Sequence, residues 1–261
     1  MKFHWALRTN TGSDNVDNIS ILSSRLEDAG YKSMLLTYFS NSHDNWIKAG
    51  RAGLPDESIK YMIAIRTYAI SPEYCAMICR SFEEMLPGKL SLNIVNGLIQ
   101  KTENSIENLI RPDRRLESVD GRRIYTAEWL EKFMSLDNGN PEIYLSGNSD
   151  ETRAMCNYFN IGHGSSLNRF KKYLDSGKKV INSIEMVAAS VVVRDTDEEA
   201  MSFILNSSEK NMLPWTIYGS KDSVVRQIKD LELAGVTDIM IDGYLEDQEC
   251  YRVDEIVKTW Q

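Results

Sequence analysis

The sequence lacks the features that would tie the protein to a membrane or to nucleic acid. No stretch approaches the ~18–20 uninterrupted apolar residues that a membrane-spanning helix needs. The first ten residues, MKFHWALRTN, contain no apolar segment typical of a secretory signal. Lys and Arg number 30 against 38 Asp and Glu, which gives a formal net charge of −8. We therefore expect a cytoplasmic protein with no membrane segment and no general affinity for nucleic acid.

Residues that bind metals are also scarce. The three histidines are far apart in the sequence, and the four cysteines are Cys75, Cys79, Cys156 and Cys250. Cys75 and Cys79 are one helical turn apart, a spacing that matches neither a redox C-x-x-C motif nor a zinc-binding pair. The sequence predicts no metal site, and it predicts that the cysteines are small buried residues in a reducing compartment.

What the sequence does contain is a regular alternation of short apolar runs with amphipathic ones. Eight runs predict strands: KFHWALR, KSMLLTY, KYMIAIR, KLSLNIV, EIYLS, YFNIG, SIEMVAASVVVR and TDIMIDG. Several of these runs are apolar throughout, which indicates that both faces are covered, as in a parallel sheet. Eight such units in 261 residues predict a single domain, 1–261, folded as a (β/α)8 barrel. A doubly wound sheet is the alternative.

Helical spacing and capping residues predict the helices between these strands. They are expected at 16–29, 43–53, 71–86, about 125–136, from Ser149, 165–176, 196–207, 221–234 and about 246–259. Residues 98–124 are polar and too long for an ordinary connection, so we expect them to be functional. They include Arg111, Arg114, Arg115, Arg122 and Arg123. A solvated loop is the first interpretation of this arginine cluster, and a phosphate-binding role is the alternative.

Ligands of such barrels bind at the carboxyl ends of the strands. The fourth predicted strand ends in Asn96-Gly97, which therefore lie on the functional rim. We expect a set of rim and strand residues to contact the substrate, namely Trp5, Ser42, Arg66 and Ser190.

The segment IYLSGNSDE (143–151) carries a local signal for an anion site. A strand ends, Gly147 permits a tight turn, and Ser149 is suited to cap a new helix. Free N–H groups at a helix start, with a hydroxyl beside them, can hold a phosphate. A plain helix cap is the alternative interpretation.

Three ordered segments resemble the bacterial luciferase-like, flavin-dependent monooxygenases, and among these the alkanesulfonate monooxygenases. The first is YMIAIRTYAISPEYCAMICRSFEEMLPGKLSLNIVNG, and the second is PEIYLSGNSDETRAMCNYFNIGHG. The third is IYGSKDSVVRQIKDLELAGVTDIMIDGYLEDQECYRVDEI. The resemblance covers nearly the whole chain and implies a (β/α)8 barrel. It also implies reduced FMN, supplied by a separate flavin reductase, which reacts with O₂ to form a peroxyflavin that oxygenates an organic substrate.

The resemblance also assigns roles to residues. It places the FMN phosphate at Gly147, Asn148 and Ser149, and it places the flavin ring beside Asn96 and Gly97. Two tyrosines match family tyrosines: Tyr125, which reaches the flavin, and Tyr244, near the reacting centre. Tyr244 is interpreted as a catalytic donor to the reacting oxygen, with simple packing at the barrel mouth as the alternative.

The sequence departs from the sulfonate enzymes at several places. Ala188 and Ser190 stand where those enzymes have Arg and His, which argues against an alkanesulfonate substrate. Ser42 stands in place of Cys, and His163 in place of Trp. His163 is interpreted as a catalytic proton shuttle or substrate contact, with a structural role as the alternative.

The insertion before the last strand is short, so the mobile lid of the sulfonate enzymes is missing. An open mouth predicts a substrate larger than a short alkanesulfonate, such as a carrier-tethered one, and a homodimer whose partner helps to cover the site. Two other functions stay open: a non-catalytic flavin-binding or partner subunit, and an oxidoreductase that uses a deazaflavin in the same barrel.

Overall fold

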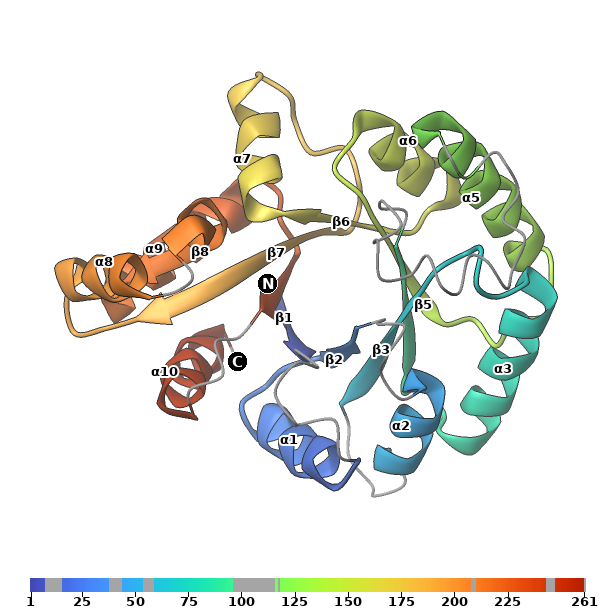
Figure 1. The fold of residues 1–261 in the computed structure, drawn as a ribbon, viewed down its shortest axis with the longest axis horizontal. Coiled ribbons are helices and arrows are strands. Elements are labelled where there is room, and N and C mark those ends of the chain that lie inside the picture. Colours follow the sequence, from blue (N-terminus) through green and yellow to red (C-terminus); the bar gives the residue numbers. More distant parts are fainter. Residues whose placement is uncertain are drawn as a thin grey trace.

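The strands of the protein close into a barrel. The computed structural model describes residues 1–7, 16–37, 44–53, 59–95, 116, 118–207, 210–242 and 247–260. Within them the strands are β1 (Lys2–Leu7), β2 (Ser33–Leu36), β3 (Lys60–Ile65), β4 (Leu90–Val95), β5 (Glu142–Ser146), β6 (Gly162–Ser166), β7 (Glu185–Val193), β8 (Thr216–Gly219) and β9 (Asp238–Asp242). The sheet order is β6-β5-β4-β3-β2-β1-β9-β7-β8, and β6 also pairs with β7. All of these pairs are parallel, so eight strands form a closed parallel barrel (Figure 1).

Helices follow the strands and surround the barrel, which confirms the predicted (β/α)8 architecture. They are α1 (Val16–Asp28), α2 (Asn45–Ala52), α3 (Pro72–Met85), α5 (Val119–Met134), α6 (Asp150–Phe159), α7 (Leu167–Asp175), α8 (Asp197–Asn206), α9 (Lys221–Leu233) and α10 (Asp247–Val257), with the 3₁₀ turns η4 (Lys210–Trp215) and η5 (Lys258–Trp260). Ser71 caps α3 by accepting the Tyr74 N–H, with Pro72 at the first position as expected. Helix α5 begins before the predicted start at about 125, because Ser118 caps it. Among the helices described, none is long and apolar enough to cross a membrane.

The sixth strand lies later in the sequence than predicted. The run YFNIG (158–162) was expected to be a strand, but α6 continues to Phe159, and Asn160 ends it in the left-handed conformation with φ of 53°. The observed strand is GHGSS, which has no apolar pattern. It pairs with β5 on one side and with β7 on the other, so its neighbours define it as a strand.

Strand β7 is long enough to serve two pairings. Met186–Ala189 pair with β9 inside the barrel, whereas Ser190–Val193 run beyond it and pair with β8. Strand β8 was not predicted. Together with α8, α9 and the second half of β7 it forms a side lobe that projects from the barrel, at the left of Figure 1. The side lobe has a small core of its own around Val192, Ala200 and Ile204.

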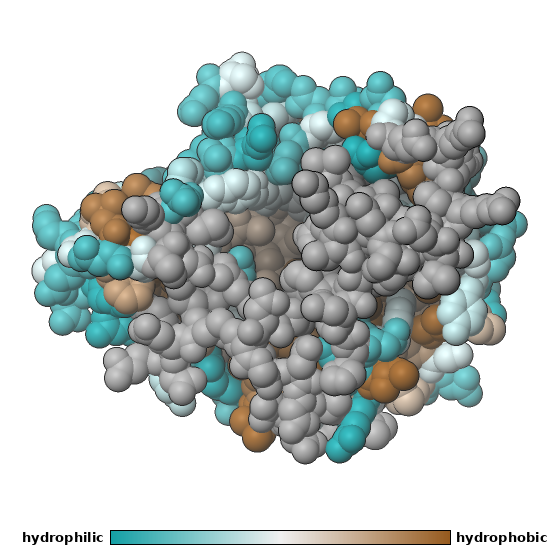
Figure 2. All heavy atoms as spheres, viewed as in Figure 1, coloured by the Kyte–Doolittle hydropathy of each residue, from teal (hydrophilic) through white to brown (hydrophobic). Residues whose placement is uncertain are grey.

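The core has an inner and an outer part, divided by the barrel wall. A cluster inside the barrel gathers residues from six strands: Ala6, Leu35, Met62, Ala64, Tyr144, Met186 and Met240. The larger cluster includes their strand neighbours, such as Leu145 and Val187, together with residues of the helices. Since successive side chains of a strand face opposite sides, each residue can be assigned to the interior or to the helix side. Figure 2 shows polar residues over much of the described outer surface and apolar side chains in a hollow near its centre.

Candidate functional site

The mouth of the barrel, where the strands end, is the candidate site. The structure describes the strand ends themselves and the whole β5–α6 connection. Four predicted site residues lie outside the described residues: Ser42, Asn96, Gly97 and Tyr244. Their assigned roles stay predictions.

Strands β3, β4 and β5 bring polar side chains together at this mouth. Arg66 is buried two residues after the inward-facing Ala64, and its Nη1 donates to the Val95 carbonyl oxygen at 3.3 Å. Beside it, Ser146 Oγ donates to Oδ1 of the buried Asn93 at 2.6 Å. Arg66 therefore places a cation at the rim, and its contact with a substrate stays a prediction.

Trp5 is placed differently from its prediction. Its ring is buried in the outer cluster, 5.7 Å from the Tyr31 ring in an edge-to-face contact. The guanidinium carbon of Arg25, from α1, lies 5.7 Å from the centre of the same ring. Because Ala6 faces the interior, Trp5 faces the helix side, and this position does not fit a substrate contact.

The connection between β5 and α6, residues 147–149, has the geometry expected of a tight anion loop. Gly147 donates its N–H to the Gly164 carbonyl oxygen at 2.9 Å, and a Cβ at Gly147 would lie only 2.7 Å from Thr152 Oγ1. The carbonyl oxygen of the Asn148 side chain accepts from the Ser166 N–H at 3.3 Å. Ser149 caps α6 by accepting the Thr152 N–H at 3.2 Å. These contacts fix the loop to β6 and aim the start of α6 at the mouth.

The start of α6 already holds an anion of the chain itself. Hydrogen bonds from its own backbone N–H and from the Ser149 hydroxyl, together with the charge of Arg123, lower the pKa of Glu151. Arg123, on α5, lies 3.1 Å from the Glu151 carboxylate. A carboxylate held by a hydroxyl, a helix N–H and a guanidinium shows that this donor set accepts negative charge.

Tyr125 lies on α5, which packs against α6. The side chain is half-buried and contacts the outer cluster. Its predicted contact with the flavin stays a prediction.

His163 is the most constrained of the predicted residues. Its β6 position pairs with Leu145 of the outer cluster, so the ring faces the helix side and is fully buried. Nδ1 lies 3.0 Å from both carboxylate oxygens of Glu185, and Nε2 lies 2.8 Å from the Gly147 carbonyl oxygen. Arg153 Nη1 donates to the same Glu185 at 2.5 Å. We call Arg153, His163 and Glu185 the support cluster. With both ring nitrogens engaged behind the barrel wall, His163 does not fit the predicted role of proton shuttle in front of a flavin.

Ser190 marks the point where β7 leaves the barrel. It pairs with Thr216 of β8 and shares the face of the inward Ala188. The side chain is buried, and within the described part of the chain its hydroxyl has no hydrogen-bond partner. A buried polar atom without a partner at the rim fits the predicted contact with a ligand.

The opposite end of the barrel contains a buried network of charged and polar groups. His4 Nε2 lies 2.8 Å from Asp238 Oδ1, and the Tyr144 hydroxyl donates to the same oxygen at 3.1 Å. Burial raises the pKa of Asp238, but the hydrogen bond and charge of His4 lower it more, so the net pKa lies below its usual value. Among the described residues no group of three or more His, Cys, Asp or Glu side chains could hold a metal ion.

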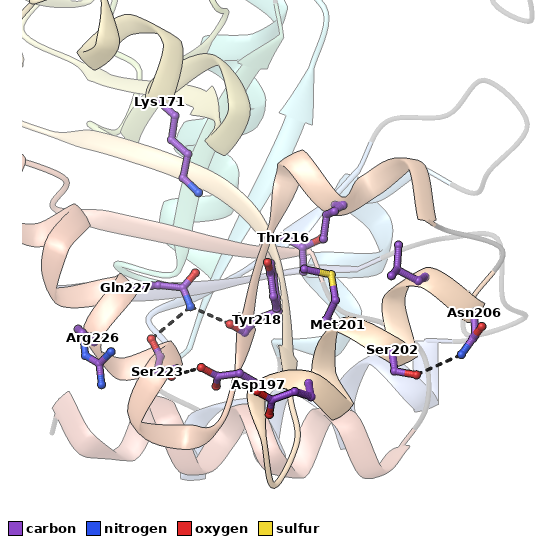
Figure 3. A pocket seen from close by; sticks show the side chains of 13 residues that line it. Lys171, Asp197, Met201, Ser202, Asn206, Thr216, Tyr218, Ser223, Arg226 and Gln227 are labelled. Atoms are coloured by element: carbon purple, nitrogen blue, oxygen red, sulfur yellow. Dashed lines mark hydrogen bonds between the residues drawn. The ribbon is translucent and has the colours of Figure 1, made fainter.

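A second hollow lies outside the barrel, on the side lobe. This lateral cleft has a volume of about 920 Å³ and is lined by residues of α7, α8, β8 and α9. Figure 3 shows that several of its polar groups bind one another: Gln227 donates to the Tyr218 carbonyl oxygen at 2.7 Å, and Ser223 Oγ donates to Asp197 at 2.8 Å. Several polar groups of this cleft are therefore already paired, and we place the candidate site at the barrel mouth, where the parallel strands end.

Comparison with known proteins agrees with the geometry. A scan against protein-family models finds no match. The fold is similar to that of a long-chain alkane monooxygenase, with 12% sequence identity over 100% of this chain and 91% of that chain and a TM-score of 0.78. It is also similar to the oxygenating constituent of 3,6-diketocamphane monooxygenase from Pseudomonas putida, a type II Baeyer–Villiger enzyme in complex with FMN (16% identity, 99% and 96% covered, TM-score 0.69). The coenzyme F420-dependent tetrahydromethanopterin reductase from Methanopyrus kandleri shares the fold as well (13% identity, 99% and 99% covered, TM-score 0.67).

At these low sequence identities, the comparisons show a shared fold and nothing more. The chain has the fold of the luciferase-like flavin monooxygenases, as the resemblance in sequence predicted.

Proposed function

We propose that the protein is an FMN-dependent monooxygenase of the luciferase-like type, which inserts one oxygen atom of O₂ into an organic substrate. The observation that carries this proposal is the anion-holding start of α6, placed at the mouth of a barrel whose fold is shared with an FMN-bound monooxygenase. Reduced FMN, delivered by a separate reductase, would supply the electrons that activate O₂.

The residues at the mouth fit a flavin phosphate. Ser149, the first N–H groups of α6 and Arg123 already hold the Glu151 carboxylate, and a phosphate dianion would bind the same donors more strongly. Asn148 would bring its backbone N–H to the phosphate, and Gly147 would permit the tight turn that places it there. Tyr125 would reach the flavin from α5.

Other residues of the chain would prepare the space for the ring and the substrate. Met62, Met186 and Met240 fill the barrel interior and exclude water from below the mouth. Asn96 and Gly97 would lie beside the flavin ring. Tyr244 would donate a hydrogen bond or a proton to the reacting oxygen.

The substrate side differs from that of a sulfonate enzyme. Ala188 and Ser190 supply no cation on β7, so we propose a substrate without a sulfonate group. Arg66, Ser190 and Ser42 would contact its polar part. A larger or carrier-tethered substrate fits the short insertion before β9, and a second copy of the chain would help to cover the mouth.

A deazaflavin-dependent oxidoreductase is the second candidate, because the F420-dependent reductase shares the fold over the whole chain. A flavin-binding subunit without catalysis is the third. Both alternatives have the same barrel. The second differs from the first in its cofactor, and the third differs because it turns over no substrate.

Titration of the purified protein separates these candidates. We expect reduced FMN to bind more tightly than riboflavin and F420, measured by fluorescence and calorimetry under anaerobic conditions. Admission of O₂ to the complex without substrate should release H₂O₂ rapidly if the mouth is open. Preference for F420 over FMN would support the second candidate and contradict the first. Tight FMN binding, with O₂ consumed no differently than by free reduced flavin, would support the third candidate and contradict the first.

A further inference from the structure

His163 supports the connection 147–149 from the helix side of the barrel wall. The groups that contact its ring determine the charge of that ring. Nε2 lies 2.8 Å from the Gly147 carbonyl oxygen, an atom that can only accept. Nε2 must therefore carry a proton. Nδ1 lies 3.0 Å from each oxygen of the Glu185 carboxylate, which also accepts as long as it is ionised.

Glu185 stays ionised because Arg153 binds it. Nη1 of Arg153 donates to Glu185 Oε1 at 2.5 Å, and both side chains are almost entirely buried. A buried carboxylate that faces a guanidinium is strongly favoured in its charged form. Nδ1 of His163 is then a donor as well, and the ring is an imidazolium.

Among the described residues, three groups near the support cluster are neutral or paired with an opposite charge. Burial, followed by the nearby Glu185 carboxylate, raises the pKa of Cys156 on α6 to about 12, so its thiol is neutral. Tyr173 of α7 places its ring centre 4.0 Å from the Arg153 guanidinium carbon. Asp150 at the start of α6 pairs with Lys178. Two cations and one anion make up the support cluster, so one net positive charge lies directly behind the loop.

The hydrogen bond to Gly147 also has a direction. In a trans peptide the C=O and the following N–H point opposite ways, and the described chain has no cis peptide. When His163 holds the Gly147 carbonyl on the helix side, the Asn148 N–H of the same peptide unit points away from the ring, toward the mouth. An imidazolium at the carbonyl end also increases the polarity of that peptide unit.

We propose that His163 is a positioning residue for the flavin phosphate, in its protonated form. It orients the Asn148 N–H toward the phosphate and adds positive charge behind the loop, although it touches no ligand. This inference rests on the proposed flavin function.

The charge can be tested on the unmodified protein. In ¹⁵N-histidine-labelled protein, both ring nitrogens of His163 should show the chemical shifts of an imidazolium at neutral pH. A neutral ring with one bare nitrogen at pH 7 would overturn the inference, whatever the protein binds.

The role in phosphate binding is tested by comparing the affinities for FMN and for riboflavin, which has no phosphate group. We expect His163→Gln, which keeps a donor for Gly147 but not the charge, to lower the preference for FMN on the order of tenfold, with riboflavin affinity unchanged. His4→Gln, at the other end of the barrel, is the matched control and should leave the preference unchanged. An unchanged preference in His163→Gln, or an equal loss for both flavins, would overturn the role. If the unmodified protein binds neither flavin, the proposed function fails and the phosphate role with it, while the nitrogen shifts still decide the charge.

Discussion

The two ends of the barrel each bury a histidine, and the partners of the two rings differ. At the amino-terminal end, Nδ1 of His4 lies 2.6 Å from the Ser33 hydroxyl, a group that can either donate or accept. At the mouth, Nε2 of His163 faces the Gly147 carbonyl oxygen, which can only accept. Each ring also faces one carboxylate. The hydroxyl leaves the hydrogen-bonding role of His4 Nδ1 open, and its partners lie within the network at that end. The Gly147 carbonyl oxygen fixes Nε2 of His163 as a donor and connects this ring to a loop at the mouth.

This difference predicts that the two ends of the barrel have separate roles, one in stability and one in ligand binding. The amino-terminal network joins Asp238, Tyr144 and Glu142, and Glu142 in turn pairs with Lys60 and Lys2. Most of its polar groups bind one another, although Oδ2 of Asp238 has no hydrogen-bond partner among the described residues. The groups at the mouth hold a loop whose donors point outward. We therefore expect changes at the first end to alter the free energy of unfolding, and changes at the second to alter ligand affinity.

The largest effect is expected at Asp238. Asp238→Ala leaves His4 and the Tyr144 hydroxyl without their buried acceptor, so the free energy of unfolding should fall by about 3–5 kcal/mol. Urea denaturation at pH 7 measures this loss. The ratio of FMN to riboflavin affinity in the folded variant should not change, and a changed ratio would contradict the division between the two ends.

The same network should determine how the free energy of unfolding falls at acid pH. Burial raises the pKa of Glu142, but Lys60 and Lys2 lower it more, and the pKa of Asp238 is also lowered. A carboxylate with a lowered folded-state pKa contributes stability above its unfolded pKa of about 4, and this contribution is lost as pH falls below that value. Denaturation curves between pH 7 and 3 should show this decline, and Asp238→Ala should show a shallower one.

Gly147→Ala should damage the mouth by steric overlap. The added methyl group would lie 2.7 Å from Oγ1 and 2.9 Å from Cγ2 of the buried Thr152, so we expect a loss of roughly 1–3 kcal/mol in unfolding free energy and weaker FMN binding. Thr152→Ala in the same chain removes the obstructing atoms. A double-mutant cycle should therefore show a favourable coupling between the two changes, and additive losses would refute the overlap.

Ser149→Ala tests the loop without changing its shape. A charge-assisted hydrogen bond is worth roughly 1.5–3 kcal/mol, so FMN affinity should fall by about one to two decades while riboflavin affinity stays the same. The matched control is Ser220→Ala, since Ser220 caps α9 in the side lobe by accepting the Ser223 N–H. Both variants should lose about 1 kcal/mol of helix-cap stability. Equal flavin affinities in the two variants would count against the phosphate site.

The smallest effect is expected at Glu151. Its exposed carboxylate occupies the donors that the phosphate would use, so Glu151→Gln should tighten FMN binding about two- to fivefold and leave riboflavin unaffected. Isothermal titration at low salt measures the change. Glu255→Gln, also exposed and also paired with a cation, is the control. Weaker FMN binding in Glu151→Gln would show that the carboxylate assists the site.

The sequence was sufficient for the barrel because apolar runs and capping residues repeat along the chain. It did not locate β6, since Gly-His-Gly-Ser-Ser has no apolar pattern and is held by strands on both sides. It also missed β8, a four-residue strand that pairs only with the extension of β7.

The site residues show a further limit of sequence reasoning. Trp5 was placed on a strand, as observed, but it lies on the helix side. His163 was expected just after the sixth strand, on the rim, whereas it lies within β6 with its ring on the helix side. Neighbouring positions on a strand face opposite sides, so an uncertainty of one residue in register reverses the face. The loop 147–149 was located correctly because Gly followed by Asn-Ser at a strand end has a local turn and cap chemistry, which does not depend on register.

The pairing of β1 with β9 has a consequence for how the protein is made. These strands lie at opposite ends of the described chain, and His4 pairs with Met240. During synthesis at about 5–20 residues per second, roughly 10 to 50 seconds pass between the emergence of β1 and that of its second partner. For that time one edge of a strand with four apolar residues out of six has no neighbour, which is the situation in which strands join other chains. Nascent chains of this protein should therefore depend on ribosome-associated chaperones until the last strand is released.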